Sequence, residues 1–233
     1  MTLLRDLAGM DEFRAAEALQ CTVWGAGDKE DPADLMMVVQ AEGGIAAGAF
    51  EGGQLLGYVF GFPTATPGMQ HSHRLAVLPQ ARGQGLGAAL KWYQRDWCLA
   101  RGITCVRWTY DPLRHANAAL NIARLGARVS VYCQDYYGVM AGINSGSPSD
   151  RLLADWALDA PHVAALAAGG VADAPADALR IAIPADFGAL LTADPAAALA
   201  ARLEVRAAMQ AAFADGLAVQ GYDVVRREYL LAR

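Results

Sequence analysis

The segment HSHRLAVLPQARGQGLGAAL, residues 71–90, constrains the fold more than any other part of the chain. A strand-like run over 71–78 ends at Pro79, because proline has no amide hydrogen to donate to a sheet ladder. An amphipathic run over 85–101 follows, and its large apolar residues recur at helical spacing: Leu86, Leu90, Tyr93 and Trp97. A short glycine-rich loop lies between the two runs. The segment therefore predicts a strand, a loop and a helix in that order.

The glycine-rich loop has the composition of an anion-binding site. The first amides of a helix have no partner within the helix, and they lie at the positive end of its dipole. Gly83, Gly85 and Gly87 would let these amides approach a phosphate directly, since glycine has no Cβ atom. Arg82 adds a charged donor. The residues suit a pyrophosphate, and tight packing of the loop remains the alternative.

A nicotinamide-binding loop is a third interpretation of the same residues. The stretch from Gly83 to Ala88 fits the pattern G-x-G-x-x-A, and Asp111 lies at the end of a later strand. In a dinucleotide-binding fold, however, the loop follows its strand immediately. Here five residues separate Val77 from Gly83. This spacing disfavours a nicotinamide-dependent oxidoreductase.

The composition argues against several other classes of protein. Hydrophobic residues make up 55% of the 233 and charged residues 18%, which predicts a packed core in one extended domain or a domain with an annex. The net charge is −5 and no run of lysine or arginine stands out, so we expect no nucleic acid partner. The N-terminus is charged and no apolar stretch reaches ~18 residues, so we expect no membrane partner. Four scattered cysteines without metal-ligand spacing indicate no metal site and a reduced, cytoplasmic protein.

Periodicity and turn residues predict the other elements. Helices are expected at 10–24, 116–125 and 196–217, and a helix or a strand at 33–41. Strands are expected at 3–5, 45–51, 54–62, 103–109, 129–133, 151–158, 179–183 and 222–231. Gly52 and Gly53 indicate a hairpin, because both central turn residues need positive φ. The stretch rich in alanine and glycine before Pro175 is the only piece with the composition of a linker.

The ordered context of the loop resembles the signature of the GNAT superfamily of N-acyltransferases. In that family a strand, V-x-P, R-x-x-G-x-G and a helix follow one another, and the matching residues here are Val77, Pro79, Arg82, Gly85 and Gly87. The resemblance covers residues 1–140 or thereabouts. It implies an α/β fold with a mixed, mostly antiparallel sheet flanked by helices, and chemistry that requires no metal.

The resemblance also implies where an acyl-CoA would bind. The pantetheine arm would lie along a central strand that splays from its neighbour, beside Leu75, Ala76 and Val77. The pyrophosphate would contact the loop and the start of the helix, that is Arg82, Gly83, Gln84, Gly85, Leu86 and Gly87. Asn117 on a later helix is a further candidate for coenzyme binding, with capping of that helix as the alternative.

Candidate catalytic residues flank this segment. His71 and His73 lie two apart on a strand, so they share a face, and a neutral imidazole can accept the proton that an attacking amine must lose. Their alternative is two edge or surface histidines. Many family members carry a tyrosine as general acid four residues before the glycine that ends the later helix, but Ile122 stands there. Among the tyrosines at 132, 136 and 137, Tyr137 is our candidate for the replacement acid.

A second resemblance concerns the rest of the chain. The run WTYDPLRHANAALNIARLGA, followed by YYG, GINSGSPSDR and ADW, is similar to a GNAT branch with a C-terminal extension, some members of which look like amino-acid N-succinyltransferases. It implies a core over 1–144 and an extension over 145–233 that adds a strand, a helix and a strand to the sheet within one cooperative unit. Arg151 would then hold the carboxylate of an amino acid, and an ion pair with Asp150 or Asp155 is the alternative.

We therefore expect an acyl-CoA-dependent N-acyltransferase. Acetyl-CoA or succinyl-CoA would be the co-substrate, a small amine such as an amino acid the acceptor, and transfer would be direct within a ternary complex. The chain is compatible with a homodimer. Two alternatives stay open: a GNAT-fold acyl-CoA sensor that has lost catalysis, which the isoleucine at 122 favours, and the nicotinamide-dependent oxidoreductase.

Overall fold

The computed structural model describes residues 2–25, 29–138, 146–171, 175 and 177–233. The chain divides into two compact units, with the first running to Arg107 and the second beginning at Trp108. The division falls within strand β5 (Cys105–Tyr110), so each unit contains part of that strand. None of the helices in the described ranges combines the length and the apolar character that crossing a bilayer requires.

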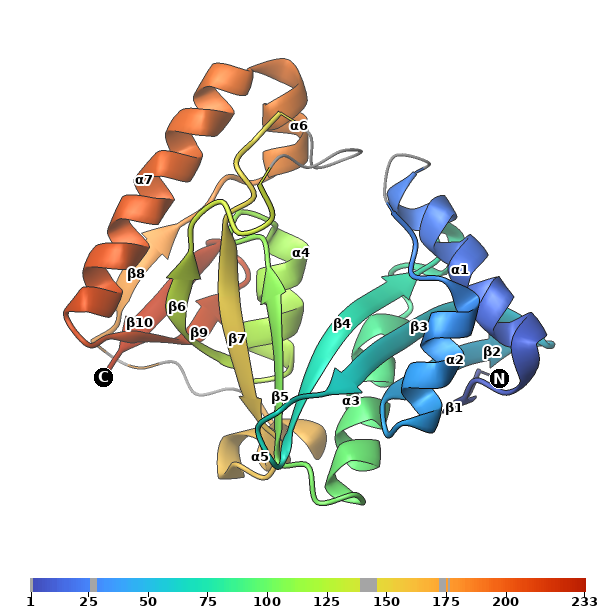
Figure 1. The fold of residues 1–233 in the computed structure, drawn as a ribbon. Helices are drawn as coiled ribbons and strands as arrows, with labels where there is room; N and C mark the ends of the chain where they lie inside the picture. The colour runs from blue at the N-terminus through green and yellow to red at the C-terminus, as the bar shows by residue number, and fades with distance from the viewer. Residues whose placement is uncertain (1, 26–28, 139–145, 172–174, 176) are drawn as a thin grey trace. The chain divides into compact units, whose positions relative to one another are not determined.

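The first unit is a mixed sheet covered by helices on both faces (Figure 1). Its strands lie in the order β1-β2-β3-β4-β5; the first four are antiparallel, and β4 and β5 are parallel. The strands and helices that precede β5 are β1 (Leu3–Asp6), α1 (Gly9–Trp24), α2 (Ala33–Ala41), β2 (Ile45–Glu51), β3 (Gln54–Pro63), β4 (Met69–Val77) and α3 (Leu86–Leu99). Gly52 and Gly53 form the predicted hairpin turn with φ of +56° and +85°. The fold prediction is confirmed for this unit almost element by element.

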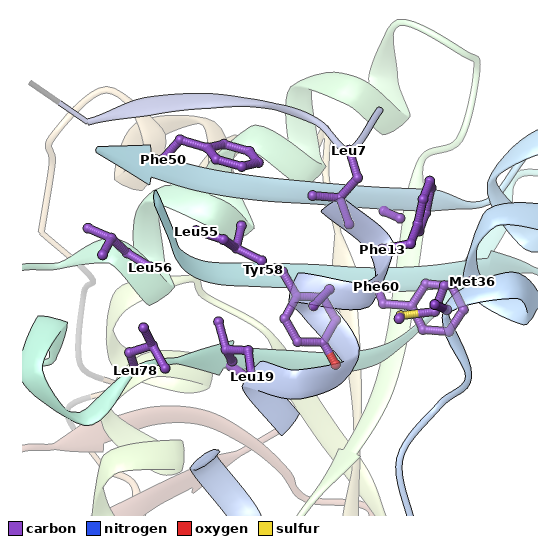
Figure 2. Close-up of a cluster of buried hydrophobic side chains, with 14 of the residues drawn as sticks. Leu7, Phe13, Leu19, Met36, Phe50, Leu55, Leu56, Tyr58, Phe60 and Leu78 are labelled. Atoms are coloured by element: carbon purple, nitrogen blue, oxygen red, sulfur yellow. The ribbon is translucent and has the colours of Figure 1, made fainter. Parts of the chain in front are cut away.

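The core of the first unit lies between the sheet and the helices α1 and α2, while α3 covers the opposite face (Figure 1). Figure 2 shows its large side chains, which come from both helices and from β2 and β3; those drawn with labels include Phe13, Leu19, Met36, Tyr58 and Phe60. Burial of one such side chain stabilises the fold by roughly 1.5–3 kcal/mol, so this layer fixes the position of the central strands.

Strand β4 has two irregularities near its histidines. Its parallel ladder with β5 covers Met69–His71. On its other side, Phe60 of β3 pairs with Arg74 and Gly61 pairs with Ser72. His73 therefore has no partner on β3 and forms a β-bulge, a feature that redirects side chains and is common beside functional sites.

The second unit is also built around a sheet, in the order β5-β7-β6-β9-β10-β8 (Figure 1). Its further elements are α4 (His115–Ala118), the π-helix η2 (Ala119–Arg124), β6 (Arg128–Cys133), β7 (Arg151–Ala157), α5 (Pro161–Ala167), β8 (Leu179–Ala182), α6 (Phe187–Ala193), α7 (Pro195–Ala214), β9 (Ala218–Asp223) and β10 (Glu228–Ala232). The pairs β6–β7, β6–β9, β9–β10 and β10–β8 are antiparallel.

Three details of the second unit go beyond or differ from the sequence prediction. The supposed linker contains helix α5, because alanine is the strongest helix former and Pro161 suits the first helical position. Helix α6 precedes the predicted α7, and each begins after an aspartate whose carboxylate accepts a backbone amide. The single strand expected at 222–231 is a hairpin, and its turn is held by Asp223 Oδ1, which accepts the amides of Val225 and Arg226. The sheet therefore gains more than a strand, a helix and a strand.

Candidate functional site

The glycine loop joins β4 to α3 in the order that the sequence predicts. A single 3₁₀ turn (Pro79–Ala81) follows β4, and α3 begins at Leu86. Gly83 and Gly85 have φ of +79° and +78°, and a Cβ atom on either would meet no atom within 4 Å. The glycines are thus required by the backbone conformation and leave open space around the loop. This space contradicts the interpretation in which they serve only tight packing.

The start of α3 has the electrostatics of an anion-binding site. Gly85 is the N-cap in the left-handed conformation, so no side chain caps the helix, and no acidic residue lies in its first turn. The helix is 14 residues long, and its dipole therefore places positive partial charge at this end. Arg82 is exposed, and its Nε donates weakly to the carbonyl of Val77 at 3.4 Å. The loop thus presents backbone amides and one exposed cation.

The strand residues proposed for the pantetheine arm lie directly before this loop. Leu75, Ala76 and Val77 pair with β3 through Val59, Tyr58 and Gly57. Ala76 is buried in the core, and the other two are half-buried. The β4–β5 ladder stops at His71, several residues before them.

The two histidines of β4 differ in their surroundings. The His71 ring stacks on Phe62 with 5.0 Å between ring centres, and burial together with the nearby charges of His73, Lys91 and Arg107 lowers the pKa of His71 to about 4. His73 lies at the bulge, has a side chain 36% exposed, and places Nε2 3.2 Å from Asp31 Oδ1. The two rings are 6.2 Å apart.

Asp31 is a candidate site residue that the sequence did not reveal. Burial alone would raise its pKa, but hydrogen bonds from His73 and Arg74 outweigh this and the pKa is lowered. Arg74 is itself fixed by the carbonyl of Lys29 and by the ring of Trp24. Asp31 precedes His73 by 42 residues in a polar break, and no local pattern links the two. An ionised carboxylate on Nε2 keeps that nitrogen protonated and leaves Nδ1 as the acceptor.

The tyrosines of the second unit have separate roles. Tyr132 donates to Asp150 at 2.6 Å, and burial raises its pKa, so it is part of the fold. Tyr137 is half exposed, and its hydroxyl lies 2.9 Å from Thr109 Oγ1. Ile122, at the position where the family resemblance leads us to expect tyrosine, is 1% exposed and belongs to the core.

The remaining predicted residues also lie in the second unit. Asn117 is on α4, but the N-cap of that helix is Arg114, so capping does not explain Asn117. The π-helix that follows is the kind of irregularity often found at functional sites. Arg151 is 8% exposed, donates to the carbonyl of Asp150 at 2.8 Å, and lines a pocket with Arg114 and Arg202. The Asp150 carboxylate is bound by Arg206, at 2.8 Å in both of its hydrogen bonds.

Comparisons with known proteins agree with this fold. Residues 11–126 match the sequence profile described as the acetyltransferase (GNAT) family. Similar solved structures include the ribosomal-protein-S18-alanine N-acetyltransferase from Escherichia coli, at 18% identity and a TM-score of 0.57 over 69% of this chain and 96% of that one. Aminoglycoside 6'-acetyltransferase type Ii has 15% identity and a TM-score of 0.57 over 68% and 98%. The structure of yncA from Salmonella typhimurium with its cofactor acetyl-CoA has 18% identity and a TM-score of 0.55 over 69% and 95%. No curated protein is significantly similar in sequence.

Proposed function

Because residues 11–126 belong to the acetyltransferase (GNAT) family, we propose that this acyltransferase moves an acetyl or succinyl group from coenzyme A to a small amine, such as an amino acid, in a ternary complex. The observation that carries the proposal is the glycine loop between β4 and α3. It combines an uncapped helix start with open space at Gly83 and Gly85, which suits a pyrophosphate. The family match favours coenzyme A over a nicotinamide cofactor.

In the proposed complex, the amides from Gly83 to Gly87 and the Arg82 guanidinium bind the pyrophosphate, while the Arg82 amide stays bonded to the carbonyl of Pro79. The backbone of Leu75–Val77 hydrogen-bonds the pantetheine arm, and Asn117 is a further coenzyme contact. The yncA structure contains acetyl-CoA, and this supports an acyl-CoA as co-substrate here. The proposals that succinyl-CoA is a co-substrate and that the protein forms a homodimer rest on the sequence alone.

The proposed base is His73 rather than His71. With a pKa of about 4, neutral His71 holds a proton too weakly to remove one from an ammonium group near pH 7. His73 has a carboxylate partner that would stabilise the imidazolium formed during proton transfer. The freed amine forms a bond to the thioester carbonyl carbon, and the C–S bond then breaks. The thiolate takes a proton, for which Tyr137 is the proposed donor.

Replacement of Gly85 tests the coenzyme site. Gly85→Glu puts a carboxylate where the phosphate is expected, so we predict that titration calorimetry finds no CoA binding, while the wild type binds CoA and not NADH. Gly53→Glu is the matched control, because Gly53 also has positive φ and open space, but lies in the β2–β3 turn. Equal CoA affinity in wild type and Gly85→Glu would remove the loop from the coenzyme site.

A thiol-release assay over a panel of amines tests catalysis separately. We expect turnover with acetyl-CoA or succinyl-CoA and at least one small amine. CoA binding without turnover on any amine would favour the non-catalytic sensor, which the core isoleucine at 122 supports.

A further inference from the structure

The turn that follows β6 carries Tyr137, and its backbone is unusual. Asp135 has φ of +45°, and Arg227 is the only other residue besides the glycines with positive φ in the part of the chain that the structure describes. Arg227 lies in the hairpin turn between β9 and β10, where positive φ is ordinary. Asp135 lies instead in the long connection between β6 and β7. A side chain in this region persists only where its surroundings hold the backbone, and such residues cluster at functional sites.

Hydrogen bonds from one neighbouring segment hold this turn. The Asp135 amide donates to Asp150 Oδ1 at 3.0 Å. The Asp135 carboxylate accepts two hydrogen bonds from Ser149, at 3.0 Å from the amide and at 3.1 Å from the hydroxyl. The hydroxyl oxygen of Ser149 in turn accepts the amide of Tyr137 at 2.9 Å. Ser149 is 2% exposed, so it joins the strained residue to the tyrosine from the interior of the unit.

The next residue, Asp150, anchors the turn to the C-terminal helix. Its carboxylate is fully buried, and Arg206 on α7 binds both of its oxygens at 2.8 Å. Tyr132 donates to the same carboxylate. Burial would raise the pKa of Asp150, but the hydrogen bonds from Arg206 and Tyr132 outweigh this effect and the pKa is lowered. An ionised carboxylate in a fixed position therefore holds the Asp135 amide.

The side chain of Tyr137 is fixed at its other end as well. Its hydroxyl lies 2.9 Å from Oγ1 of Thr109 on β5. Its ring contacts the ring of Tyr136 edge-on, with 4.8 Å between the ring centres. The residue is nevertheless 51% exposed, so these contacts do not serve to bury its ring. The unit thus holds an accessible phenol in one position.

We propose that Ser149 and Thr109 position Tyr137 as the acid of the acyl transfer, an inference that rests on the proposed function. Ser149 fixes the backbone of the tyrosine, and Thr109 donates its hydroxyl hydrogen to the phenol oxygen. With Thr109 as the donor, the phenol proton is free to leave. When the C–S bond breaks, the electron pair stays on sulfur, and the phenol O–H bond breaks as an S–H bond forms. The phenolate keeps the hydrogen bond from Thr109, which is stronger to an anion, until a proton from water restores the phenol.

A double-mutant cycle tests the part played by Thr109. Thr109→Val exchanges the hydroxyl for a methyl group of similar size, and Thr109→Ser keeps the hydroxyl. In the thiol-release assay with acetyl-CoA and an accepted amine, Tyr137→Phe and Thr109→Val should each lower kcat by about 10-fold or more and leave both KM values unchanged. Thr109→Ser should retain most of kcat. In the Tyr137→Phe background, Thr109→Val should cause no further loss, because the phenol oxygen is already absent. A loss of the same size in that background would make Thr109 a structural residue and overturn the proposal.

Hydrogen exchange tests the part played by Ser149 without relying on turnover. Ser149→Ala removes the oxygen that accepts the Tyr137 amide, so NMR should show that amide exchanging about 10-fold faster or more, and kcat should fall without a change in KM. Tyr136→Phe is the matched control and should leave kcat unchanged. Tyr136 lies in the same turn and is 53% exposed, and its hydroxyl has no hydrogen bond within the described residues. Equal exchange in wild type and Ser149→Ala, or equal losses in Tyr136→Phe and Tyr137→Phe, would overturn the proposal.

Wild-type turnover separates this proposal from the function on which it rests. If the wild type transfers the acyl group and Tyr137→Phe does so equally well, the acyl transfer stands and the positioning of an acid by Ser149 and Thr109 is refuted. If the wild type releases no thiol from acetyl-CoA or succinyl-CoA with any amine, the proposed function is refuted, and the role of Tyr137 with it.

Discussion

Lys91 is buried beneath the strand that carries the histidines, and its burial predicts how stability changes with pH. The side chain lies on α3 and is 2% exposed. Its Nζ donates to Ser72 Oγ and to Gln94 Oε1, both at 2.9 Å and both uncharged. Desolvation lowers the pKa of Lys91 from 10.5 to about 7, although the neighbouring Cys98 opposes this.

The sign and size of the effect follow from that shift. Between pH 7 and pH 10.5 the unfolded chain binds the Lys91 proton and the folded chain releases it, so the free energy of unfolding rises with pH. The slope is up to ~1.4 kcal/mol per pH unit, and the whole window amounts to about 5 kcal/mol. Below pH 7 both states are protonated, and the folded state carries the full penalty.

Lys91→Met tests this reasoning with a side chain of similar length. The variant loses two hydrogen bonds of about 1 kcal/mol each, so we expect a net gain of about 2–3 kcal/mol at pH 7. Ser72 and Gln94 still bond one another at 3.2 Å. Urea denaturation of both proteins at pH 7, 8, 9 and 10 measures the difference, which should fall as pH rises and reverse near pH 9, where the remaining penalty of ~2 kcal/mol equals the two lost hydrogen bonds. A difference that stays constant with pH would show that Lys91 is not titrating in this window.

Two further predictions concern the base and the boundary of the fold. His73→Ala should lower kcat by ~10²-fold or more, whereas His71→Ala should cost far less, because only His73 has a carboxylate partner; comparable losses in a thiol-release assay would contradict the assignment. A chain that ends at residue 144 should be insoluble or lack a sharp melting transition. In that chain β6 would lose both of its partners, β7 and β9, and the side chain of Val129, now 1% exposed, would become accessible to solvent. If calorimetry shows that the shortened chain melts cooperatively, residues 145–233 form a separate domain.

The sequence predicted the segment from β4 to α3 well because proline and glycine restrict the backbone locally. Pro79 ends the strand and Gly85 begins the helix, and both signals act within a few residues. The C-terminal elements were harder, because the alanine-rich stretch after Pro161 fits a linker and a helix equally by composition. Val224 and Val225 continue the apolar pattern of a strand, yet they lie in an exposed turn fixed by Asp223.

The sequence identified candidate residues for the site, but it could not show which side chains and strands surround them. Alternation along a strand correctly predicted that His71 and His73 lie near one another, but it did not indicate which of the two is the better base. Two facts distinguish them, and neither is local in sequence. The bulge at His73 depends on how β4 registers with β3, and the carboxylate of Asp31 comes from the segment before α2.

These two facts act together on the chemistry of β4. A regular ladder would give His73 a partner on β3, whereas the bulge removes that constraint and leaves its side chain 36% exposed beside Asp31. His71, which stays in the ladder with Phe62, keeps its ring stacked and largely desolvated. Lys91, below the same strand, adds positive charge that lowers the pKa of His71 further. Removal of that charge by Lys91→Met should therefore raise the pKa of His71, and NMR titration of the imidazole would detect the change. The buried lysine thus helps to make His71 a weak base, and the bulge gives His73 the exposed position and the carboxylate partner on which its proposed role as the base depends.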